Sequence, residues 1–205
     1  MPKGRGETSY KDTAFGIIPR SKLIPLEIEG IKRVWDFVLQ KRQQSKIPLT
    51  PEFLKKIHHV GFAWIFPEIG GKFRTIDVEV SLHTPPKFYL VPQLMKDFCN
   101  DLKERLKHLP SIQEENYLDE LSELLAWTHH RFLWIHPFAD YNGRIGRLLI
   151  NIVLLNLDLP TIELQVETPA ARKRYVKALQ AADEYNLAPL KKIIEKAIEE
   201  AVKEI

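Results

Sequence analysis

The sequence predicts an all-α domain that carries one short β-hairpin. Over most of the chain, apolar residues recur at the spacings of two to four residues that amphipathic helices show. Helix start signals, Thr50-Pro51 and Thr168-Pro169 among them, precede several of these stretches. Alternation between apolar and polar residues, which is typical of a strand, occurs in only one place. With 205 residues, 44% of them hydrophobic, the chain can bury one core, so a single domain is favoured.

The first elements follow from changes in this pattern. Residues 1–22 lack a regular period, so the first 25 residues are predicted to form an N-terminal arm that is disordered or irregularly packed. A single domain is then expected over residues 26–205. Its first helix is predicted from Leu26 to about residue 44, and its second starts at Pro51, where Thr50 supplies the cap.

The predicted hairpin lies near the end of the first half of the chain. Gly70-Gly71 breaks the chain, residues 73–80 alternate in part, and Pro85-Pro86 turns the chain back, so the hairpin should end near Val91. Periodicity and proline start signals predict the remaining helices over residues 92–108, 115–135, 142–157, 169–185 and 188–204.

Composition excludes several classes of protein. The net charge is +3 and basic residues alternate with acidic ones, which argues against a nucleic-acid partner. The single Cys99 excludes an internal disulfide and fits a reducing compartment. No signal peptide is visible, and the longest apolar run, residues 148–157, is about half the length that crosses a bilayer. We therefore expect a soluble, cytoplasmic protein without a membrane partner.

Residues 136–147 hold the densest chemistry of the chain. His136 is a candidate proton acceptor at the end of one helix, and Asp140 offers one hard oxygen ligand, as Mg²⁺ sites commonly use. Asn142 and Gly143 fall at the start of the next helix, where free backbone N–H groups bind anions. The side chains of Arg144 and Arg147 lie three residues apart on one helix face and could grip a polyphosphate. The pattern indicates phosphoryl or nucleotidyl transfer.

These twelve residues also resemble the signature of the Fic family, H-P-F-x-D/E-G-N-G-R-x-x-R. They match every specified position except one, where Tyr141 stands in place of the first glycine. The likeness covers residues 26 to about 195. It includes Phe73-Arg74 with His83-Thr84, similar to the family's strand and flap, and Arg174-Tyr175, similar to its adenine-binding segment. The resemblance implies a Fic-type helical domain in which the hairpin is the flap.

Fic proteins mostly transfer AMP from ATP to a Ser, Thr or Tyr hydroxyl of a target protein. The resemblance therefore implies an ATP-dependent protein adenylyltransferase with a target protein as partner. By the same resemblance, His136 is the general base, Asp140 holds Mg²⁺, and Arg147 orients the γ-phosphate. Asn142, Gly143 and Arg144 bind the phosphates, and Tyr175 and Asp183 line the adenine pocket. The target-binding flap consists of Ser81, Leu82, His83 and Thr84.

Two positions of the signature refine this expectation. Members of the Doc type, which transfer phosphate, carry lysine where this chain has Gly143, so the match favours transfer of AMP. Tyr141 is the departure. If that position needs a positive φ, a residue other than glycine costs about 1–2 kcal/mol there. Activity is then still expected, although the substrate could be oriented differently.

A glutamate of the first helix is a candidate regulator. Many Fic proteins carry an inhibitory helix with the pattern S/T-x-x-x-E-G/N, whose glutamate pairs with the second arginine of the signature. Residues 25–30 end in Ile-Glu-Gly and precede the core, so the resemblance implies inhibition through a Glu29–Arg147 pair. Residues 111–116 fit the letters better, but there Ser111 and Glu114 are typical of a capping box.

Other functions stay open at this stage. The chain could be a hydrolase that removes AMP with the help of Glu29, or a catalytically weak Fic module that acts as a binding or regulatory protein. The charged C-terminal helix could engage a second copy of the chain, which would give a homodimer. His58-His59 and His129-His130 lack the spacing of a zinc site and are expected to be surface or core residues.

Overall fold

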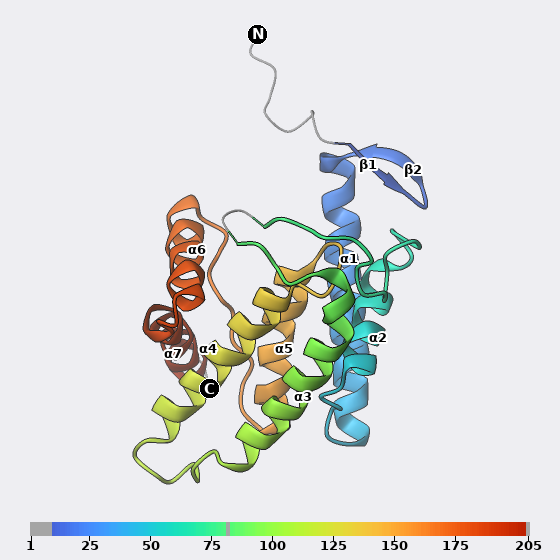
Figure 1. Ribbon diagram of the computed structural model, residues 1–205. Coiled ribbons are helices and arrows are strands. Elements are labelled where there is room, and N and C mark those ends of the chain that lie inside the picture. Colours follow the sequence, from blue (N-terminus) through green and yellow to red (C-terminus); the bar gives the residue numbers. More distant parts are fainter. Residues whose placement is uncertain (1–9, 81–82, 204–205) are drawn as a thin grey trace.

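Seven α-helices make up most of the part of the chain that the computed structural model describes, residues 10–80 and 83–203 (Figure 1). The all-α prediction with one hairpin is confirmed. The helices are α1 (Arg20–Gln44), α2 (Pro51–Phe62), α3 (Val91–Lys107), α4 (Tyr117–Ile135), α5 (Asn142–Asn156), α6 (Pro169–Asp183) and α7 (Ala188–Lys203), and a 3-10 turn, η1 (Phe88–Leu90), leads into α3.

The predicted bounds of helices α2 to α7 agree with the structure to within two residues. The start signals act as expected. The Thr50 hydroxyl accepts a hydrogen bond from the Phe53 N–H at 3.2 Å, and the Thr168 hydroxyl accepts one from Ala171 N–H at 3.2 Å. Each is followed by a proline at the first helical position, where the missing N–H costs nothing.

The first helix begins earlier than predicted, at Arg20 rather than Leu26. Pro25 lies inside α1, where it removes one backbone hydrogen bond near the start of the helix. Leu23 and Glu27, on either side of Pro25, are both buried. Their packing outweighs the backbone hydrogen bond that is lost at Pro25. Residues 20–25 therefore belong to the helix and not to an arm.

The β-hairpin lies elsewhere than predicted. Strands β1 (Tyr10–Thr13) and β2 (Gly16–Pro19) pair antiparallel within the stretch that the sequence indicated as an irregular arm. Gly16 supplies the positive φ of +84° in the turn. The turn is tied to the helical body, because the Ala14 N–H donates to the Ile65 carbonyl at 2.8 Å and Phe15 packs edge-on against Trp64.

Among the described residues of 73–91, predicted to form the hairpin, the only β-type pairing is an isolated bridge between Val80 and His83. The reason is the side chain of Arg74, which is 4% exposed. Its guanidinium donates to the carbonyls of Ile76 and Pro86, one on each arm of the loop. The Arg74 side chain thus takes the place of the backbone hydrogen bonds of a hairpin. Pro86 also has no N–H to donate to such a ladder.

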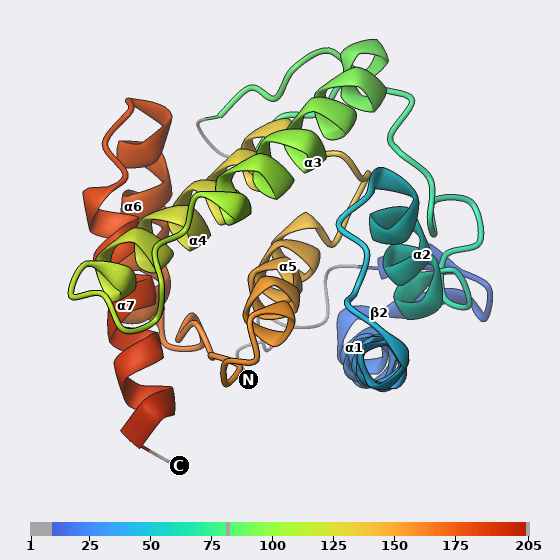
Figure 2. The same cartoon turned by 90° about the horizontal axis from the view of Figure 1, so that it is seen from below.

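Helix α5 occupies the centre of the molecule. Figure 2 shows it between the α1–α2 pair on one side and α6 with α7 on the other, with α3 and α4 crossing above. Nearly all its side chains are buried, including Ile145, Leu149 and Ile152, as expected of a helix that is apolar on every face. Its N-terminus is therefore fixed within the core. None of the helices in the described part of the chain is both long and apolar enough to cross a membrane.

Helices α1 and α2 cross at two glycines. A Cβ added to Gly30 would lie 2.3 Å from the Gly61 carbonyl oxygen, and one added to Gly61 would lie 2.7 Å from a methyl group of Val34. The first contact is with a backbone atom, so it cannot be relieved without moving the helices apart, whereas the second is with a side chain. Gly30 therefore sets how closely α1, and with it Glu27, approaches the rest of the fold.

We predict that Gly30→Ala destabilises the protein. In an exposed helix this substitution would stabilise by about 1 kcal/mol, because alanine is the better helix former. Here it should lower the free energy of unfolding by about 1–3 kcal/mol, since overpacking forces the two helices apart. Urea denaturation measures the change. Glu29→Ala, at an exposed neighbour on the same helix, is the control and should shift stability by less than about 0.5 kcal/mol. A Gly30→Ala protein as stable as the parent would refute the tight crossing.

Candidate active site

The predicted site lies on the loop that joins α4 to α5. His136, directly after α4, has φ +50° and ψ +60°, and Tyr141, directly before α5, has φ +63°. Both are left-handed conformations, which are uncommon for residues other than glycine. The loop therefore turns sharply at each end, and it presents the His136 ring and the start of α5 to the same cavity.

The position of His136 leaves one ring nitrogen free to accept a proton. Its Nδ1 lies 3.3 Å from the Leu133 carbonyl oxygen, which can only accept, so Nδ1 carries the hydrogen and Nε2 is the free base. Burial lowers the pKa of His136 to about 4, and the neighbouring charge of Arg74 acts in the same direction. The ring is therefore neutral at pH 7, as a general base must be.

Arg74 fixes the turn after α4. Its Nε donates to the His136 carbonyl at 2.8 Å, and its backbone N–H donates to the Pro137 carbonyl at 2.9 Å. These carbonyls belong to the helix end, where no intrahelical donors remain. Because the same guanidinium also binds the loop of residues 76–86, one buried cation sets the position of His136 relative to that loop.

Two further polar side chains close the loop from within. Asn142 accepts from the Phe138 N–H at 2.9 Å and donates to the Phe138 carbonyl at 2.8 Å. His58 Nε2 lies 3.2 Å from the Asp140 carbonyl while its Nδ1 accepts from Gly71 N–H, and burial lowers its pKa to about 4. His58 is thus a core residue, as expected. The Asn142 side chain is fully used by the loop, so only its backbone N–H is available to a ligand.

Tyr141 does occupy a position with positive φ, and the structure shows what compensates the strain. Its ring stacks on Phe62 with centroids 3.9 Å apart and planes at 8°. Its hydroxyl donates to Glu27 Oε1 at 2.8 Å, and its N–H donates to Asp140 Oδ1 at 2.7 Å. The side chain points into the core, so it does not cover the phosphate site.

Glu27 is the carboxylate of α1 that contacts Tyr141 and Arg144 of the site. It is 1% exposed and accepts from Arg144 Nη2 at 2.6 Å, from Arg20 Nη1 at 2.6 Å and from Tyr141. Burial alone would raise the pKa of Glu27, but the hydrogen bonds from Arg144 and Tyr141 outweigh it and lower the pKa below its usual value. The carboxylate is therefore charged and fixes one edge of the Arg144 guanidinium.

The other edge of Arg144 and the start of α5 offer donors without partners. Arg144 Nη1 is buried and makes no hydrogen bond with the described residues. The backbone N–H groups of Asn142 and Gly143 likewise have no partner within residues 10–80 and 83–203. A buried unpaired guanidinium nitrogen costs free energy unless a ligand satisfies it. Together with the helix N-terminus it forms an anion site.

The predicted Glu29–Arg147 pair is not formed. Glu29 is exposed and pairs with Arg33 one turn along the same helix, at 3.0 Å. Arg147 makes no ion pair within the described part of the chain, and its guanidinium lies against Gly143 on the cavity wall. The physical reason is helical geometry. Glu27 shares a face with Leu23, Gly30 and Val34, which pack inward, whereas Glu29, two residues on, points to solvent.

The cavity beside these groups has a volume of about 570 Å³. Tyr175 and Asp183, predicted to line an adenine pocket, both lie on its wall. The Tyr175 hydroxyl lies 2.6 Å from buried His129 Nε2, and Asp183 accepts from His130 Nε2 at 2.9 Å. Helix α6 therefore supplies a wall of fixed side chains opposite the catalytic loop, and the cavity is large enough for a nucleotide.

Asp140, the predicted metal ligand, is about half exposed and lies 3.6 Å from the Lys11 ammonium group of strand β1. No group of three His, Cys, Asp or Glu side chains in the described residues could hold a metal on its own. Asp140 lies on the loop that also carries His136, although it does not line the cavity itself. Its single carboxylate still fits Mg²⁺, which is commonly bound through one or two carboxylates plus substrate phosphates.

The predicted flap is described only in part. Ser81 and Leu82 lie outside the described residues. His83 lines the cavity, and its Nε2 lies 2.9 Å from the Trp134 carbonyl, while Thr84 is exposed. The structure thus brings His83 to the site beside His136 and leaves Thr84 at the surface.

Sequence reasoning missed Glu27, Arg74, Arg20 and Lys11. One signal was available for Glu27. Leu23, Glu27, Gly30 and Val34 recur at spacings of four, three and four, so the carboxylate takes a core position in an apolar stripe. A charged residue at such a position needs a buried partner. No local pattern distinguishes Arg74 from a strand residue.

Solved structures with this fold were found. Fic-1 from C. elegans aligns with a TM-score of 0.65 and 24% identity, covering 87% of this chain and 49% of that one. BepC, an effector protein from Bartonella tribocorum solved with bound AMPPNP, aligns with a TM-score of 0.63 and 17% identity, covering 95% and 94%. At these identities the likeness establishes the fold.

Sequence comparison extends the relation. The protein adenylyltransferase Fic of Culex quinquefasciatus is 30% identical over 168 residues, which are 82% of this chain and 31% of that protein. The chain thus spans about a third of the length of this curated relative. The Fic/DOC family profile matches residues 48–154, which include the whole loop from His136 to Arg147. Since that match covers more than half of the 205 residues, the chain belongs to the Fic/DOC family.

Proposed function

We propose that the protein transfers AMP from ATP to a hydroxyl side chain of a target protein. The observation that carries this proposal is the pairing of two features on one cavity. A neutral histidine with a free Nε2 lies on one side, and unpaired donors from Arg144 and the α5 N-terminus lie on the other. The relatives that are named protein adenylyltransferases support the same reaction.

The reaction follows from this arrangement. His136 Nε2 takes the proton of the target hydroxyl, and the hydroxyl oxygen forms a bond to the α-phosphorus of ATP. The bond from the α-phosphorus to the bridging oxygen breaks, and pyrophosphate leaves with that electron pair. Arg144, the backbone N–H groups of Asn142 and Gly143, and Arg147 bind the phosphate oxygens and stabilise their charge. Tyr175 and Asp183 form the wall for the adenine.

The residues present also fit a magnesium ion. Asp140 would hold it, and the ion would neutralise charge on the phosphates. The target segment would lie against the loop that carries Ser81, Leu82, His83 and Thr84. There a strand of the target would pair with the flap, and its hydroxyl would be delivered to His136.

The central test is covalent labelling. Incubation with Mg²⁺ and ATP labelled at the α-phosphate should label the protein or an added hydroxyl-bearing acceptor, whereas ATP labelled at the γ-phosphate should not. His136→Ala should abolish labelling, and His108→Ala, at an exposed histidine, should leave it unchanged. The pKa of His136 in the protein without bound substrate is about 4. The second-order rate constant for labelling should therefore fall only as the pH drops towards 4. Labelling from the γ-phosphate would instead indicate phosphate transfer.

We further infer that Glu27 supports the active arrangement and does not inhibit it. The carboxylate is buried on a long, packed helix and takes three donors, so it is part of the fixed framework. It leaves Arg144 Nη1 free for phosphate, and Arg147 has no carboxylate partner within the described residues. The inhibitory and hydrolytic roles considered for Glu29 required that residue at the phosphates, and it lies in solvent.

Glu27→Gln separates the two roles. If Glu27 fixes Arg144, the substitution should lower the rate of AMP transfer by roughly ten- to hundredfold. The reason is that the Arg144 guanidinium would no longer be held in the orientation that binds the phosphates. Tyr141→Phe should give a smaller loss, since it removes one of the three donors to Glu27. Both rates come from α-phosphate labelling of variants whose folding is checked by circular dichroism. Faster labelling in Glu27→Gln would show that the glutamate is a brake.

Lys11 should weaken metal binding at Asp140. Its ammonium group lies beside the carboxylate, so the ion and the lysine compete for the same oxygens. Lys11→Ala should tighten Mn²⁺ binding, measured by electron paramagnetic resonance with a non-hydrolysable ATP analogue, by up to about fivefold, the value of an exposed ion pair. Lys56→Ala, at an exposed lysine of α2, should leave the affinity unchanged. Equal affinities in all three proteins would mean that Lys11 does not compete.

A further inference from the structure

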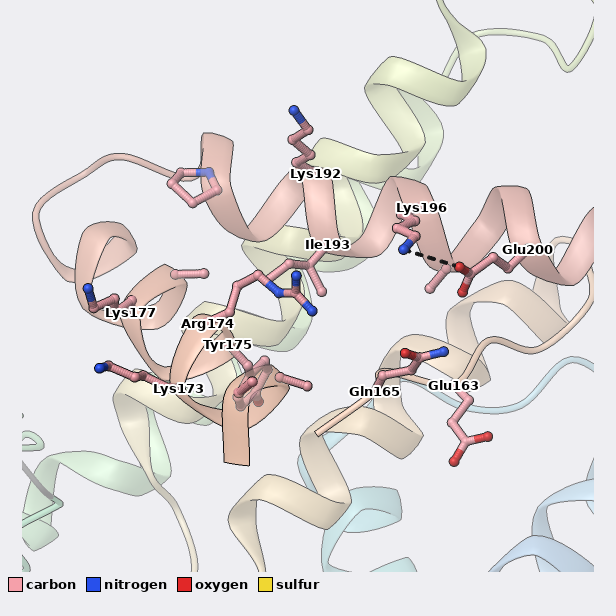
Figure 3. Close-up of a pocket in the computed structure, with 15 residues that line it drawn as sticks. Glu163, Gln165, Lys173, Arg174, Tyr175, Lys177, Lys192, Ile193, Lys196 and Glu200 are labelled. Atoms are coloured by element: carbon pink, nitrogen blue, oxygen red, sulfur yellow. Dashed lines mark ion pairs between the residues drawn. The ribbon is translucent and has the colours of Figure 1, made fainter. Parts of the chain in front are cut away.

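A second groove lies between α6 and α7 (Figure 3), and Tyr175 lines both this groove and the catalytic cavity. The volume of the groove is about 700 Å³. Helix α6 forms one wall and α7 the other, and Glu163 and Gln165 line one end of the groove. The proposed reaction uses none of its residues except Tyr175.

The groove has an apolar floor and a basic rim. Ala178, Ile193 and Ala197 lie along the floor. Five basic side chains line the groove against two carboxylates, Glu163 and Glu200. Lys196 is paired with Glu200 at 3.5 Å, and Figure 3 shows Arg174 reaching from α6 towards Ile193 with its guanidinium inside the groove. The remaining basic side chains, Lys173, Lys177 and Lys192, make no ion pair within the described residues.

The segment at the end of the groove belongs to no helix or sheet. Residues 161–166 alternate between exposed and buried side chains, as in an extended chain over a core (Figure 1, the orange stretch that joins α5 to α6). Both backbone groups of Ile162 bond to the side chain of Asn151 on α5, at 2.7 and 3.0 Å. That edge of the segment therefore faces α5.

The opposite edge faces the groove. In an extended chain the N–H and C=O of one residue point to one side, and those of the next residue point to the other. Since Ile162 points to α5, the backbone groups of Glu163 and Gln165 point away from it, and both residues line the groove. These backbone groups make no hydrogen bond within residues 10–80 and 83–203. A free edge of this kind can accept another strand.

We propose that this groove binds an acidic, extended segment of a partner protein, which adds as a strand to the edge at Glu163 and Gln165. The backbone edge supplies the hydrogen bonds, and the floor takes alternate apolar side chains. Arg174, whose guanidinium lies inside the groove, binds acidic side chains of the segment, and the lysines of the rim add positive charge around it. The charge of the rim selects an acidic segment over a basic one. Because Tyr175 lines both the groove and the catalytic cavity, such a partner would be held close to the site of transfer.

The test uses a synthetic peptide and no ATP, so it does not depend on the proposed reaction. A fluorescein-labelled peptide of about eight residues that alternates valine and aspartate matches the length of a strand. Fluorescence anisotropy should show binding that weakens as salt is added. A peptide alternating valine and lysine is the matched control and should bind at least about tenfold more weakly, a difference of roughly 1.4 kcal/mol.

Two N-methylated versions of the acidic peptide test strand pairing. Methyl groups on one alternate set of amides block one edge of the peptide, and methyl groups on the other set block the opposite edge. Only one edge can face Glu163 and Gln165, so one version should lose binding and the other should retain it. Gln165→Pro, which removes the N–H of that residue, should weaken binding by the parent peptide.

Protein variants test the location. Arg174→Glu should weaken binding by about tenfold, and Lys203→Glu, the same charge change at an exposed position of α7 outside the groove, should leave it unchanged. Thermal melting followed by circular dichroism confirms that both variants fold. The proposal is overturned if the acidic peptide does not bind, if it binds no better than the basic one, or if both methylated versions bind equally well.

Discussion

A buried carboxylate, Glu27, joins the first helix to the loop between α4 and α5 through hydrogen bonds from Arg20, Tyr141 and Arg144. Removing one charge from such a cluster leaves the others uncompensated in a medium that solvates them poorly. Glu27 therefore couples the position of the Arg144 side chain to the positions of the first residues of α1 and α5. The close crossing of α1 and α2 at Gly30 is what allows the carboxylate to reach the loop.

The loop itself stores strain at both ends, where His136 and Tyr141 have positive φ. Each strained residue is held by contacts from elsewhere in the chain. Arg74 binds the carbonyl of His136, and Phe62 and Glu27 hold Tyr141. This over-determination keeps His136 and the hydrogen-bond donors of Gly143 and Arg144 on one cavity. It also explains how a tyrosine can stand where the family signature has glycine. The Tyr141 ring packs in the core, so it does not enter the space proposed for the substrate.

Much of the fold could be predicted because its signals are local. Thr50 and Thr168 cap the helices that they were expected to cap, and the bounds of α2 to α7 follow periodicity. The prediction failed where a distant side chain replaced a local preference. Residues 73–80 alternate like a strand, yet Arg74 takes the carbonyls that a partner strand would have bound. Residues 20–25 look like an arm that ends at Pro25, yet the burial of Leu23 and Glu27 continues the helix through it.

The sequence by itself determined the family, the succession of helices and the residues of the candidate site, because each is encoded within a short stretch such as residues 136–147. The tertiary structure alone decided which glutamate meets which arginine. Glu27 and Glu29 differ by two positions, and a helix turns about 200° over that distance, so one faces the core and the other faces water. It also decided that Lys11 meets Asp140 and that Glu163 and Gln165 expose a free edge. These contacts join segments far apart in the chain, and only the packing of the helices brings them together.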